Sequence, residues 1–569
     1  MKPINKYIII SFFTLFLFSC ENFLEEENRS NITAEGYFTD AEGFETLVSA
    51  AYSTLRDVWG DDPWLFCLGV DIYTRGESEI VGGSYGNRDV FSSELNEYAN
   101  LDPQNAFVSD FYTDCYRAIQ VCNTAISRAD GVSGISDSRK EQRLAEVRFL
   151  RAYYYYLLVE QFGDIPIVEE EINGVATHFD RASEESVYQF IISELEASKN
   201  NLPDVAEEFG RITKGAVNHL LALMHLTRGY KSYAAGNDFA MAASLADEVI
   251  NSGHYSLVST FEDVFTPGNE NNNEIIFSVQ YDAGTLGVNN QGLPDGNGQS
   301  AHWGWELWTK EPGFERENPT YNWKKSQFTP TQFLYSLFDT SVDSRYDVTF
   351  LSTFYATTDD ESRGIKAGDL KVYFPKWDEE FTEQDSLDFM AEHPVASIYT
   401  YPTWKQDFAN VGGSGKFPMV WKFHDPDAAF HGNTTNYTST RDIFLFRLAE
   451  TYLIAAEAYL QSGDNGTAAE RINTVRRRAA IPGNEAAMEI GAGDVDLDLV
   501  LDERAREFIG EYKRWMDLKR TGKLMERTLE HNNLAKRESQ LQEFHLLRPI
   551  PQSVIDRDTG EFPQNPGYN

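Results

Sequence analysis

The sequence predicts a mostly α-helical protein: a tetratricopeptide-like scaffold of paired helices that carries a large, irregular, aromatic-rich insert. Three observations support this fold class. Apolar residues recur every three or four positions in long stretches near both ends of the chain. These stretches form pairs of about 34 to 40 residues, a length typical of repeats that bury their faces only by stacking. Between them, over residues 253–440, the helical period fails and Gly, Pro, Asn and aromatic residues dominate.

The candidate helices fall into four pairs, followed by one more helix. The pairs are 41–58 with 106–130, 138–162 with 183–201, 211–233 with 238–251, and 441–461 with 465–480, and the further helix is Val500–Arg520. In the fourth pair the apolar helical pattern begins at Ile443. We therefore expect one domain over residues 41–569, in which helical pairs at about 41–251 and 441–522 enclose the insert.

Two segments interrupt the helices. The first, Gly60–Asp102, is rich in Gly, Asp and Tyr, and the second is the insert, where the alternating stretch 274–281 reads as a strand. Seven of the ten tryptophans lie between Trp303 and Trp421. A hydrophobic core requires no such clustering, so the insert is the first place to look for a binding site.

Composition excludes some classes of function. The 569 residues contain 49 Lys and Arg against 89 Asp and Glu, which gives a formal net charge of −40. This charge argues against a general nucleic-acid binder, because phosphate neutralisation needs clustered basic residues. No metal-ligand spacing such as CxxC occurs, and we expect no cofactor and no catalytic metal. We expect Cys67, Cys115 and Cys122 to be small core residues.

The N-terminus carries an export signal. Two lysines precede an apolar run, Tyr7–Phe18, which is too short to span a bilayer and matches the core of a signal peptide. The run ends in Leu17–Cys20, which resembles a bacterial lipobox. Residues 1–19 are then the signal peptide, and residues 20–40 the lipid anchor at Cys20 and its tether. The alternative is an ordinary secretory signal whose cleavage site happens to contain a cysteine.

Several motifs in the mature chain resemble one known family. They are RLAETYLIAAEA at 447–458 with INTVRRRA at 472–479, LDERAREF at 501–508 with RWMDLKRTG at 514–522, LRPIPQ at 547–552 with PQNPGY at 563–568, and CENFL at 20–24. These motifs are similar to those of the SusD/RagB outer-membrane lipoproteins.

The resemblance implies both a role and a location. It implies a surface-exposed lipoprotein of a Gram-negative outer membrane that binds oligo- or polysaccharide and delivers it to a SusC-like TonB-dependent transporter, which it caps. It implies binding without catalysis. The acidic run Glu25–Glu27 resembles the signals that send such lipoproteins to the outer face. We expect the motif residues Arg504, Glu507 and Asp517 to pair within the scaffold rather than to touch sugar.

The densest aromatic cluster is the predicted ligand site. Neutral glycans present C–H faces and hydroxyl groups, so proteins bind them with exposed aromatic rings flanked by polar side chains. The candidate residues here are Trp303, Trp305, Trp308, Tyr321 and Trp323. Large apolar groups at a surface usually mark an interaction site. The alternative is that these rings attach an irregular segment to the helices.

The early insertion supplies a second patch. Its candidate ligand residues are Trp64, near the start of the insertion, and Tyr85 and Asn87, which lie within or beside a glycine-rich stretch at residues 82–86. In the family, loops from this region and from the later segment meet to form the glycan site. A role in turn formation is the alternative for the glycines.

Enzyme motifs are incomplete. Gly82–Gly86 matches GxSxG with Ser84 as nucleophile, but the surroundings are helical pairs rather than an α/β sheet. Gly412–Phe417 lacks two positions of a P-loop. Asp494, Asp496 and Asp498 imitate the start of an EF-hand, yet the later Gly and Glu are absent; we expect them to supply negative charge ahead of a helix.

Two alternatives to glycan capture stay open. One is a peptide-binding member of the same transporter-lid architecture, which would show a cleft with backbone-pairing edges and few stacked tryptophans. The other is a surface glycosidase, which needs only two suitably spaced carboxylates among the 89 acidic residues.

Overall fold

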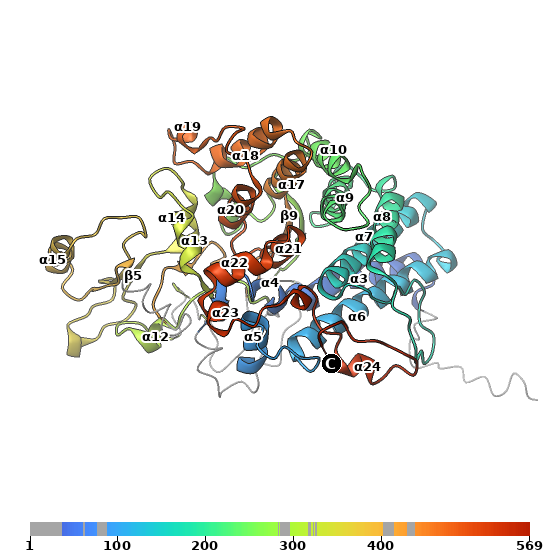
Figure 1. Cartoon of the computed structure of the whole chain (residues 1–569), viewed down its shortest axis with the longest axis horizontal. Coiled ribbons are helices and arrows are strands. Elements are labelled where there is room, and N and C mark those ends of the chain that lie inside the picture. The colour runs from blue at the N-terminus through green and yellow to red at the C-terminus, as the bar shows by residue number, and fades with distance from the viewer. Residues whose placement is uncertain are drawn as a thin grey trace, which may run out of the picture.

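The computed structural model describes residues 37–60, 63–76, 88–282, 284, 296–316, 320–321, 324, 327–401, 415–428 and 439–568. Paired helices form one part of the molecule, on the right and at the top of Figure 1, and most of the insert forms a lobe on the left, with α15 near its tip. This arrangement confirms the predicted fold class.

Eight long helices make up the scaffold. They are α3 (Ala41–Trp59), α6 (Ala106–Arg128), α7 (Asp137–Phe162), α8 (Glu184–Lys199), α9 (Lys214–Gly229), α10 (Asp238–Ile250), α17 (Leu448–Gln461) and α18 (Asn465–Ala479). Local signals set their ends: Ser136 caps the first turn of α7 by accepting the Arg139 N–H, and Gly163 ends α7 at a φ of 71°.

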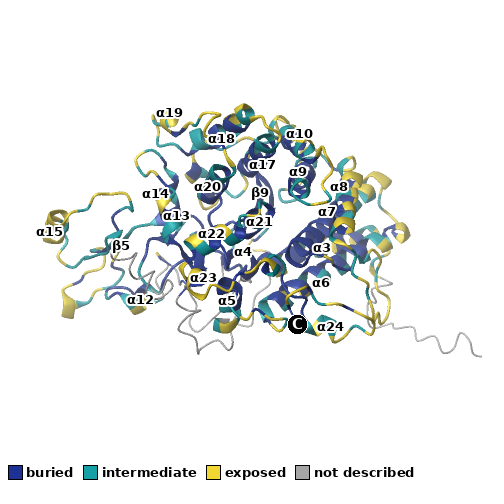
Figure 2. Cartoon of the chain, in the orientation of Figure 1, coloured by how far each residue is buried: buried dark blue, intermediate teal, exposed yellow. Residues whose placement is uncertain are grey.

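The helices stack in one continuous series. Helix α7 packs against α6 and α8, α9 packs against α8 and α10, and α17 packs against α10 and α18. Helix α17 therefore continues the stack although the whole insert separates it from α10 in the sequence. The interior of the stack is buried, whereas α15 at the lobe tip has no buried residue (Figure 2).

Two predicted helices need correction. Residues Ile443–Arg447 form strand β9 rather than the start of α17, because this segment of four apolar residues and an arginine pairs antiparallel with β2 (Ile275–Val279), and every residue of both strands is buried. The predicted helix Val500–Arg520 is two helices, α20 (Leu497–Glu507) and α21 (Arg514–Arg520). The chain breaks between them, where Gly510 and Tyr512 have φ values of 72° and 62°.

The remaining elements are short. The helices are α4 (Trp64–Cys67), α5 (Arg88–Glu97), α11 (Phe261–Phe265), α12 (Leu307–Lys310), α13 (Gln332–Ser336), α14 (Arg345–Thr349), α15 (Glu383–Glu392), α19 (Glu485–Met488), α22 (Leu524–His531), α23 (Asn533–Glu538) and α24 (Gln552–Ile555). The strands are β1 (Tyr73–Arg75), β3 (Phe328–Pro330), β4 (Phe350–Leu351), β5 (Thr353–Tyr355), β6 (Leu370–Tyr373), β7 (Ser397–Ile398) and β8 (Met419–Val420). They pair as β1–β3, β4–β8 and β5–β6–β7.

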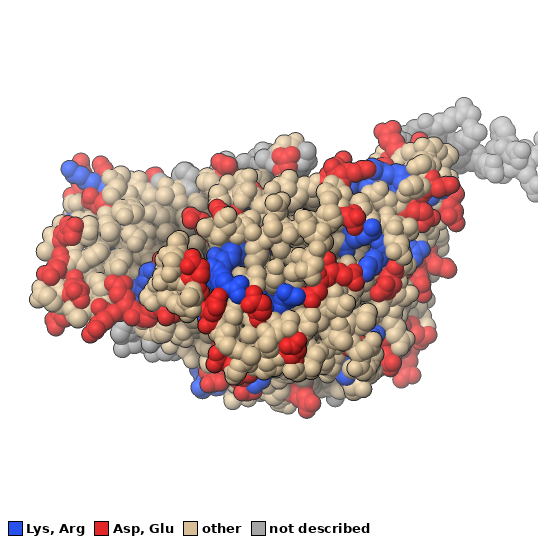
Figure 3. Space-filling view, turned by 90° about the horizontal axis from the view of Figure 1, so that it is seen from above, with Lys and Arg blue, Asp and Glu red and all other residues tan. Residues whose placement is uncertain are grey.

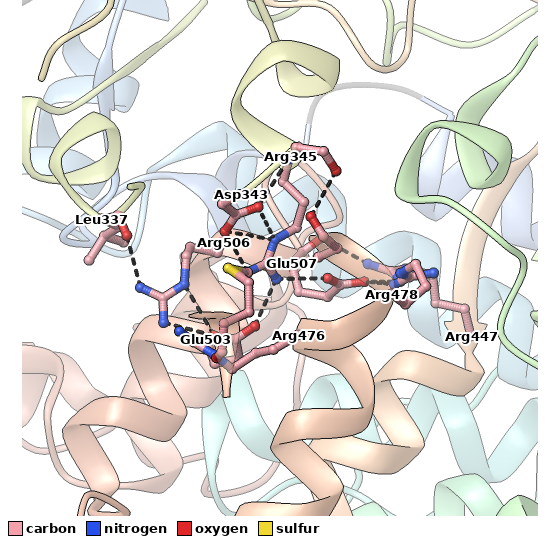
Figure 4. Close-up of polar contacts among 12 residues, drawn as sticks. Leu337, Asp343, Arg345, Arg447, Arg476, Arg478, Glu503, Arg506 and Glu507 are labelled. Carbon is pink, nitrogen blue, oxygen red and sulfur yellow. Dashed lines mark hydrogen bonds and ion pairs between the residues drawn. The ribbon is translucent and has the colours of Figure 1, made fainter. Parts of the chain in front are cut away.

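A buried ion network joins the lobe to the scaffold (Figure 4). Arg345, at the start of α14, donates to Asp343 at 2.7 Å, to Glu503 at 2.8 Å and to Glu507 at 3.0 Å. The Glu507 carboxylate also accepts from Arg447 at 2.7 Å. These groups are almost completely buried, so each charge depends on its partners for the solvation it has lost.

The motif residues are structural, as predicted. Arg504 donates to Asp517 at 2.7 Å and to Glu450 at 3.1 Å, and Asp517 also accepts from Arg520 at 3.0 Å. The three described cysteines are buried and unbridged, which confirms the expectation that they are core residues. Over the described residues, no helix is both long and apolar enough to cross a membrane.

Candidate functional site

The two predicted aromatic patches meet in the structure. Strand β1 of the early insertion pairs with β3 of the later segment, so Tyr73 lies opposite Pro330. The rings of Trp64 and Phe328 lie 5.2 Å apart between centroids, and those of Tyr73 and Trp303 4.8 Å apart. The meeting place is nevertheless part of the core rather than a surface.

The prediction of an exposed platform is wrong for Trp303 and Trp305, whose exposed fractions are 0% and 1%. Trp303 packs against Tyr73 and Phe328, and the Trp305 Nε1–H donates to the Phe417 carbonyl at 2.9 Å. Short strands and one-turn helices bury little surface by themselves, so large rings fill the space between them. The alternative of a structural role therefore holds for both tryptophans.

Trp64 and Tyr321 are likewise buried, which contradicts their prediction as exposed ligand contacts. Trp64 stacks on Phe107 with centroids 4.4 Å apart, which anchors the early insertion to α6. Tyr85, Asn87, Trp323 and Ser84 lie outside the described residues, as does the anchor Cys20. Their roles stay predictions.

Trp308 differs from its two neighbours because it lies at the surface. It sits on α12 with 39% of its area exposed, and the Arg316 guanidinium lies 5.3 Å from its ring centroid. The turn that carries Arg316 is bound to the end of β5, since the Thr357 N–H donates to the Gly313 carbonyl at 2.8 Å. Nearby on β5, Tyr355 is 49% exposed. Trp308 thus remains a predicted ligand residue.

An aromatic row continues from Tyr355 into the lobe, and we define it as Tyr355, Tyr321, Trp421 and His424. The Tyr355 N–H donates to the Tyr321 hydroxyl at 2.7 Å. The rings of Tyr321 and Trp421 lie 6.0 Å apart, and Trp421 stacks on His424 at 3.9 Å with an interplanar angle of 12°. Trp421 and His424 are half-buried. The row brings residues from three separate stretches into contact.

Sequence reasoning missed three members of this row. Tyr355 stands in no motif, and Trp421 and His424 have no neighbours in the sequence that suggest a site. The only signal was the tryptophan count between Trp303 and Trp421. The stacked pair itself depends on the fold, because residues 419–420 pair with β4 and so position Trp421.

The imidazole of His424 in the aromatic row is uncharged. Burial, together with the positive charges of Lys324 and Arg441, lowers the pKa of His424 to about 3, so the imidazole is neutral at physiological pH. Burial also lowers the pKa of Lys324 to about 7. Its Nζ lies 5.1 Å from the Trp421 ring centroid. The row therefore offers flat rings and a neutral imidazole rather than a fixed ion pair.

The buried carboxylate nearest to α12 is unsuited to acid catalysis. Burial acts to raise the pKa of Glu311, but hydrogen bonds from Lys416 at 2.6 Å, Tyr399 at 2.5 Å and Lys371 at 3.0 Å outweigh burial and lower it. A glycosidase acid requires a raised pKa. Among the described residues, no group of His, Cys, Asp or Glu is arranged to hold a metal ion.

The other motifs have structural roles where they are described. Asp496 caps α20 by accepting the Leu499 N–H at 2.8 Å, which confirms the expectation of negative charge ahead of a helix. On the face shown in Figure 3, basic side chains form small separate clusters among acidic ones. This face therefore presents no continuous basic surface among its described residues for a polyanion.

Comparisons with known proteins identify the family. A family model described as "SusD family" matches residues 273–568, and one described as "Starch-binding associating with outer membrane" matches residues 22–226. The chain is 26% identical to SusD-like protein P25 of Formosa agariphila, with 96% of each chain covered. It is 27% identical to the starch-binding protein SusD of Bacteroides thetaiotaomicron, over 77% of this chain and 75% of that protein.

Solved structures share the fold. A laminarin-binding SusD-like protein aligns with a TM-score of 0.68 at 20% identity, covering 93% of this chain and all of that one. Surface glycan-binding protein A from Bacteroides thetaiotaomicron, in complex with laminarihexaose, aligns with a TM-score of 0.67 at 20% identity and the same coverage. Since the first family model matches more than half of its length, this chain belongs to the SusD family.

Proposed function

We propose that this protein captures an extracellular oligo- or polysaccharide and delivers it to a SusC-like TonB-dependent transporter. The observation that carries the proposal is the exposed Trp308 ring, with the Arg316 guanidinium 5.3 Å from its centroid, in a member of the SusD family. Relatives named for binding starch, laminarin and laminarihexaose support the ligand class.

The chemistry of the surface suits a neutral sugar. The face of an indole carries partial negative charge, which attracts the partially positive C–H bonds of a pyranose ring. Arg316 and the Tyr355 hydroxyl supply hydrogen bonds beside it, and the neutral His424 adds no charge to the aromatic row. We expect Trp308 and Tyr355 to hold the sugar and the buried Trp303 and Trp305 to hold the surface in place.

Binding without turnover is part of the proposal. Hydrogen bonds from two lysines and a tyrosine outweigh burial and lower the pKa of Glu311, which disfavours this carboxyl group as the acid of glycosidic cleavage. We expect the chain to leave bound oligosaccharides intact. Chromatography of an oligosaccharide panel after prolonged incubation with the protein checks this, and any shortened product contradicts it.

The location follows from the N-terminal sequence. We propose that residues 1–19 are removed and that Cys20 carries the lipid that holds a single SusD-like domain, residues 41–569, at the outer face of the outer membrane. The lipobox-like ending of the signal and the family description that names the outer membrane support this location. Metabolic labelling with radioactive palmitate should mark the wild-type chain but not the C20A variant.

A glycan-binding screen tests the function. The soluble form that begins after Cys20 is screened against a panel of neutral and charged glycans, and calorimetry follows on each hit. Trp308→Ala should abolish binding or weaken it by about tenfold to a hundredfold, since a stacked ring contributes on the order of 1–3 kcal/mol by analogy with other stacked ligands. The control is Leu387→Ala, an exposed apolar residue on α15.

The outcomes separate the parts of the proposal. A hit that Trp308→Ala binds as tightly as the wild type does moves the ligand site away from Trp308. If no glycan of the panel binds, a peptide ligand is favoured. Co-purification from membranes with a SusC-like barrel then tests separately whether the protein associates with a transporter.

A further inference from the structure

A separate cavity of about 330 Å³ lies on the helical scaffold. Three segments line it: the connection 204–213 between α8 and α9, residues 254–255 after α10, and residues 271–278, which include most of β2. Helices α8 to α10 lie on the opposite side of Figure 1 from α12 and β5. The cavity is therefore distinct from Trp308 and the aromatic row. Its volume is at the lower end of the range of about 300 to 1,000 Å³ for small-ligand sites.

An aromatic ring is built rigidly into this cavity. The Tyr255 and Thr213 hydroxyls share a hydrogen bond of 2.7 Å, and Thr213 is also the N-cap of α9. The ring lies directly on Gly215, where an added Cβ would come within 2.4 Å of Tyr255 Cε2. A side chain at this position would collide with the ring, so glycine lets Tyr255 approach the helix closely. Tyr255 is half-buried, so part of the ring stays accessible.

Amide groups line the wall beside the ring. Asn272 is committed to the loop, because its Oδ1 accepts the Glu274 N–H at 3.0 Å and its Nδ2 donates to the Asn269 carbonyl at 2.8 Å. Asn271, Asn273 and His254 are exposed, and within the described part of the chain their side chains make no hydrogen bond, although the backbones of His254 and Asn273 do. An amide donates and accepts, as a sugar hydroxyl does.

The charges at the cavity are already compensated. Asp204 pairs with Lys214 at 3.3 Å, and Glu207 accepts from Arg139 at 2.5 Å. Arg211 donates to Glu146 at 2.9 Å. Because Lys214, Arg139 and Arg211 are engaged by carboxylates, a phosphate or carboxylate ligand would find no unpaired lysine or arginine among these residues. An uncharged ligand with many hydroxyl groups fits this lining better than an anion.

We propose that this cavity binds one sugar unit of a neutral glycan. The ring of Tyr255 receives the apolar face of the sugar, and Asn271, Asn273 and His254 bind its hydroxyls. The site goes beyond the one proposed at Trp308, since it lies on the other part of the molecule. Two sites on one rigid chain raise the residence time of a polysaccharide that reaches both, without either site binding tightly alone.

Calorimetry and saturation-transfer NMR with laminari-, malto-, cello-, manno- and xylohexaose test this inference on the soluble chain. In the W308A background, the proposal expects residual binding of a hexaose. Adding N271A and N273A should weaken that residual binding roughly tenfold, since two hydrogen bonds are lost. The control is N201A in the same W308A background, an exposed asparagine on the connection between α8 and α9 that does not line the cavity. Thermal unfolding checks that all variants remain folded.

Three results overturn the proposal. If W308A abolishes all binding, the ligand has one site, and the function proposed above survives without the second. If, in the W308A background, the N271A/N273A variant binds each hexaose with the same affinity as the N201A variant, the cavity is not a sugar site. If the wild type binds none of the hexaoses, the second site fails, and the glycan panel described above then decides the proposed function.

Discussion

The scaffold and the lobe reach stability by different routes. In the scaffold, each long helix buries a periodic apolar face against its neighbours, so many small contacts share the stabilisation. In the lobe, strands of two to four residues and helices of one to three turns bury little surface, and single large rings and ion pairs replace periodic faces. A change at one residue should therefore cost more in the lobe than in the scaffold.

The difference also explains where binding residues can lie. A helix that must pack on two neighbours leaves few of its apolar residues at the surface, whereas the lobe has rings both in its core and on its outside. Trp305 and Trp308 are three residues apart, yet one is buried and the other exposed. Neighbouring tryptophans in such a segment do not share a role.

The largest effect is expected at the ion network. Arg345→Met removes the cation between Asp343, Glu503 and Glu507. Asp343 then loses its side-chain cation, while Glu503 keeps Arg476 and Glu507 keeps Arg447, and we expect the protein to be destabilised by about 3–5 kcal/mol. Urea unfolding followed by tryptophan fluorescence measures this. The control is Arg363→Met, an exposed partner of Asp360, for which we expect a change within about 0.5 kcal/mol. If the two variants have equal free energies of unfolding, the network does not stabilise the contact between the lobe and the scaffold.

Acid should act through the same network. The positive charges of Arg478, Arg447 and Arg345 outweigh burial and lower the pKa of Glu507 to about 2. Because this value is below the pKa of about 4.5 in the unfolded chain, the carboxylate stabilises the fold fully above that value and loses its contribution as the pH falls towards 2.

Chemical unfolding at neutral pH and at several acidic values tests this sign. The wild type should lose stability steadily below about pH 4.5. Glu507→Gln should be less stable at neutral pH and should lose less on acidification. A steeper loss in the Gln variant than in the wild type contradicts the assignment.

A smaller effect is expected at Trp305. Trp305→Phe keeps a ring in the core but removes the hydrogen bond from the Trp305 Nε1–H to the Phe417 carbonyl, a loss of about 1–3 kcal/mol. Trp308→Phe is the matched control on the exposed neighbour. If both replacements are neutral, the lobe tolerates change as a scaffold helix does, and the contrast between the two regions fails.

The smallest change in stability is expected at Trp308 itself. Trp308→Ala should leave the free energy of unfolding within about 0.5 kcal/mol of the wild type, because the residue is exposed on a one-turn helix. Glycan affinity should fall in the same variant. Loss of both folding and binding would mean that Trp308 belongs to the core.

The sequence was most informative where structure is local. The helical pairs were predicted to within a few residues, since capping residues such as Ser136 and breakers such as Gly163 act on neighbouring backbone. Strand β9 was missed because Ile443–Arg447 becomes a strand only by pairing with β2, which lies far away in the chain. The break at Tyr512 was missed because a left-handed tyrosine has no signature in the sequence.

The candidate site could be predicted only as a region. The density of tryptophans marked residues 303–421, but it did not separate Trp308 from Trp303, because burial depends on which rings arrive from other segments. The pairing of β1 with β3 and the stacking of His424 on Trp421 are contacts between distant residues. Neither contact can be predicted from amino-acid composition.

The pairing of β2 with β9 has a consequence for exchange between relatives. Because these two strands lie side by side, the long excursion between them leaves and re-enters the helical stack at a single point. Lengthening such an excursion is inexpensive in chain entropy, at about 0.6 kcal/mol for each doubling of a flexible loop. We therefore expect that the segment between the two strands can be exchanged between relatives. A chimera that keeps β2, β9, the Asp343–Arg345 corner and the β3 and Trp303 contacts with the early insertion should fold with the ligand preference of the donor.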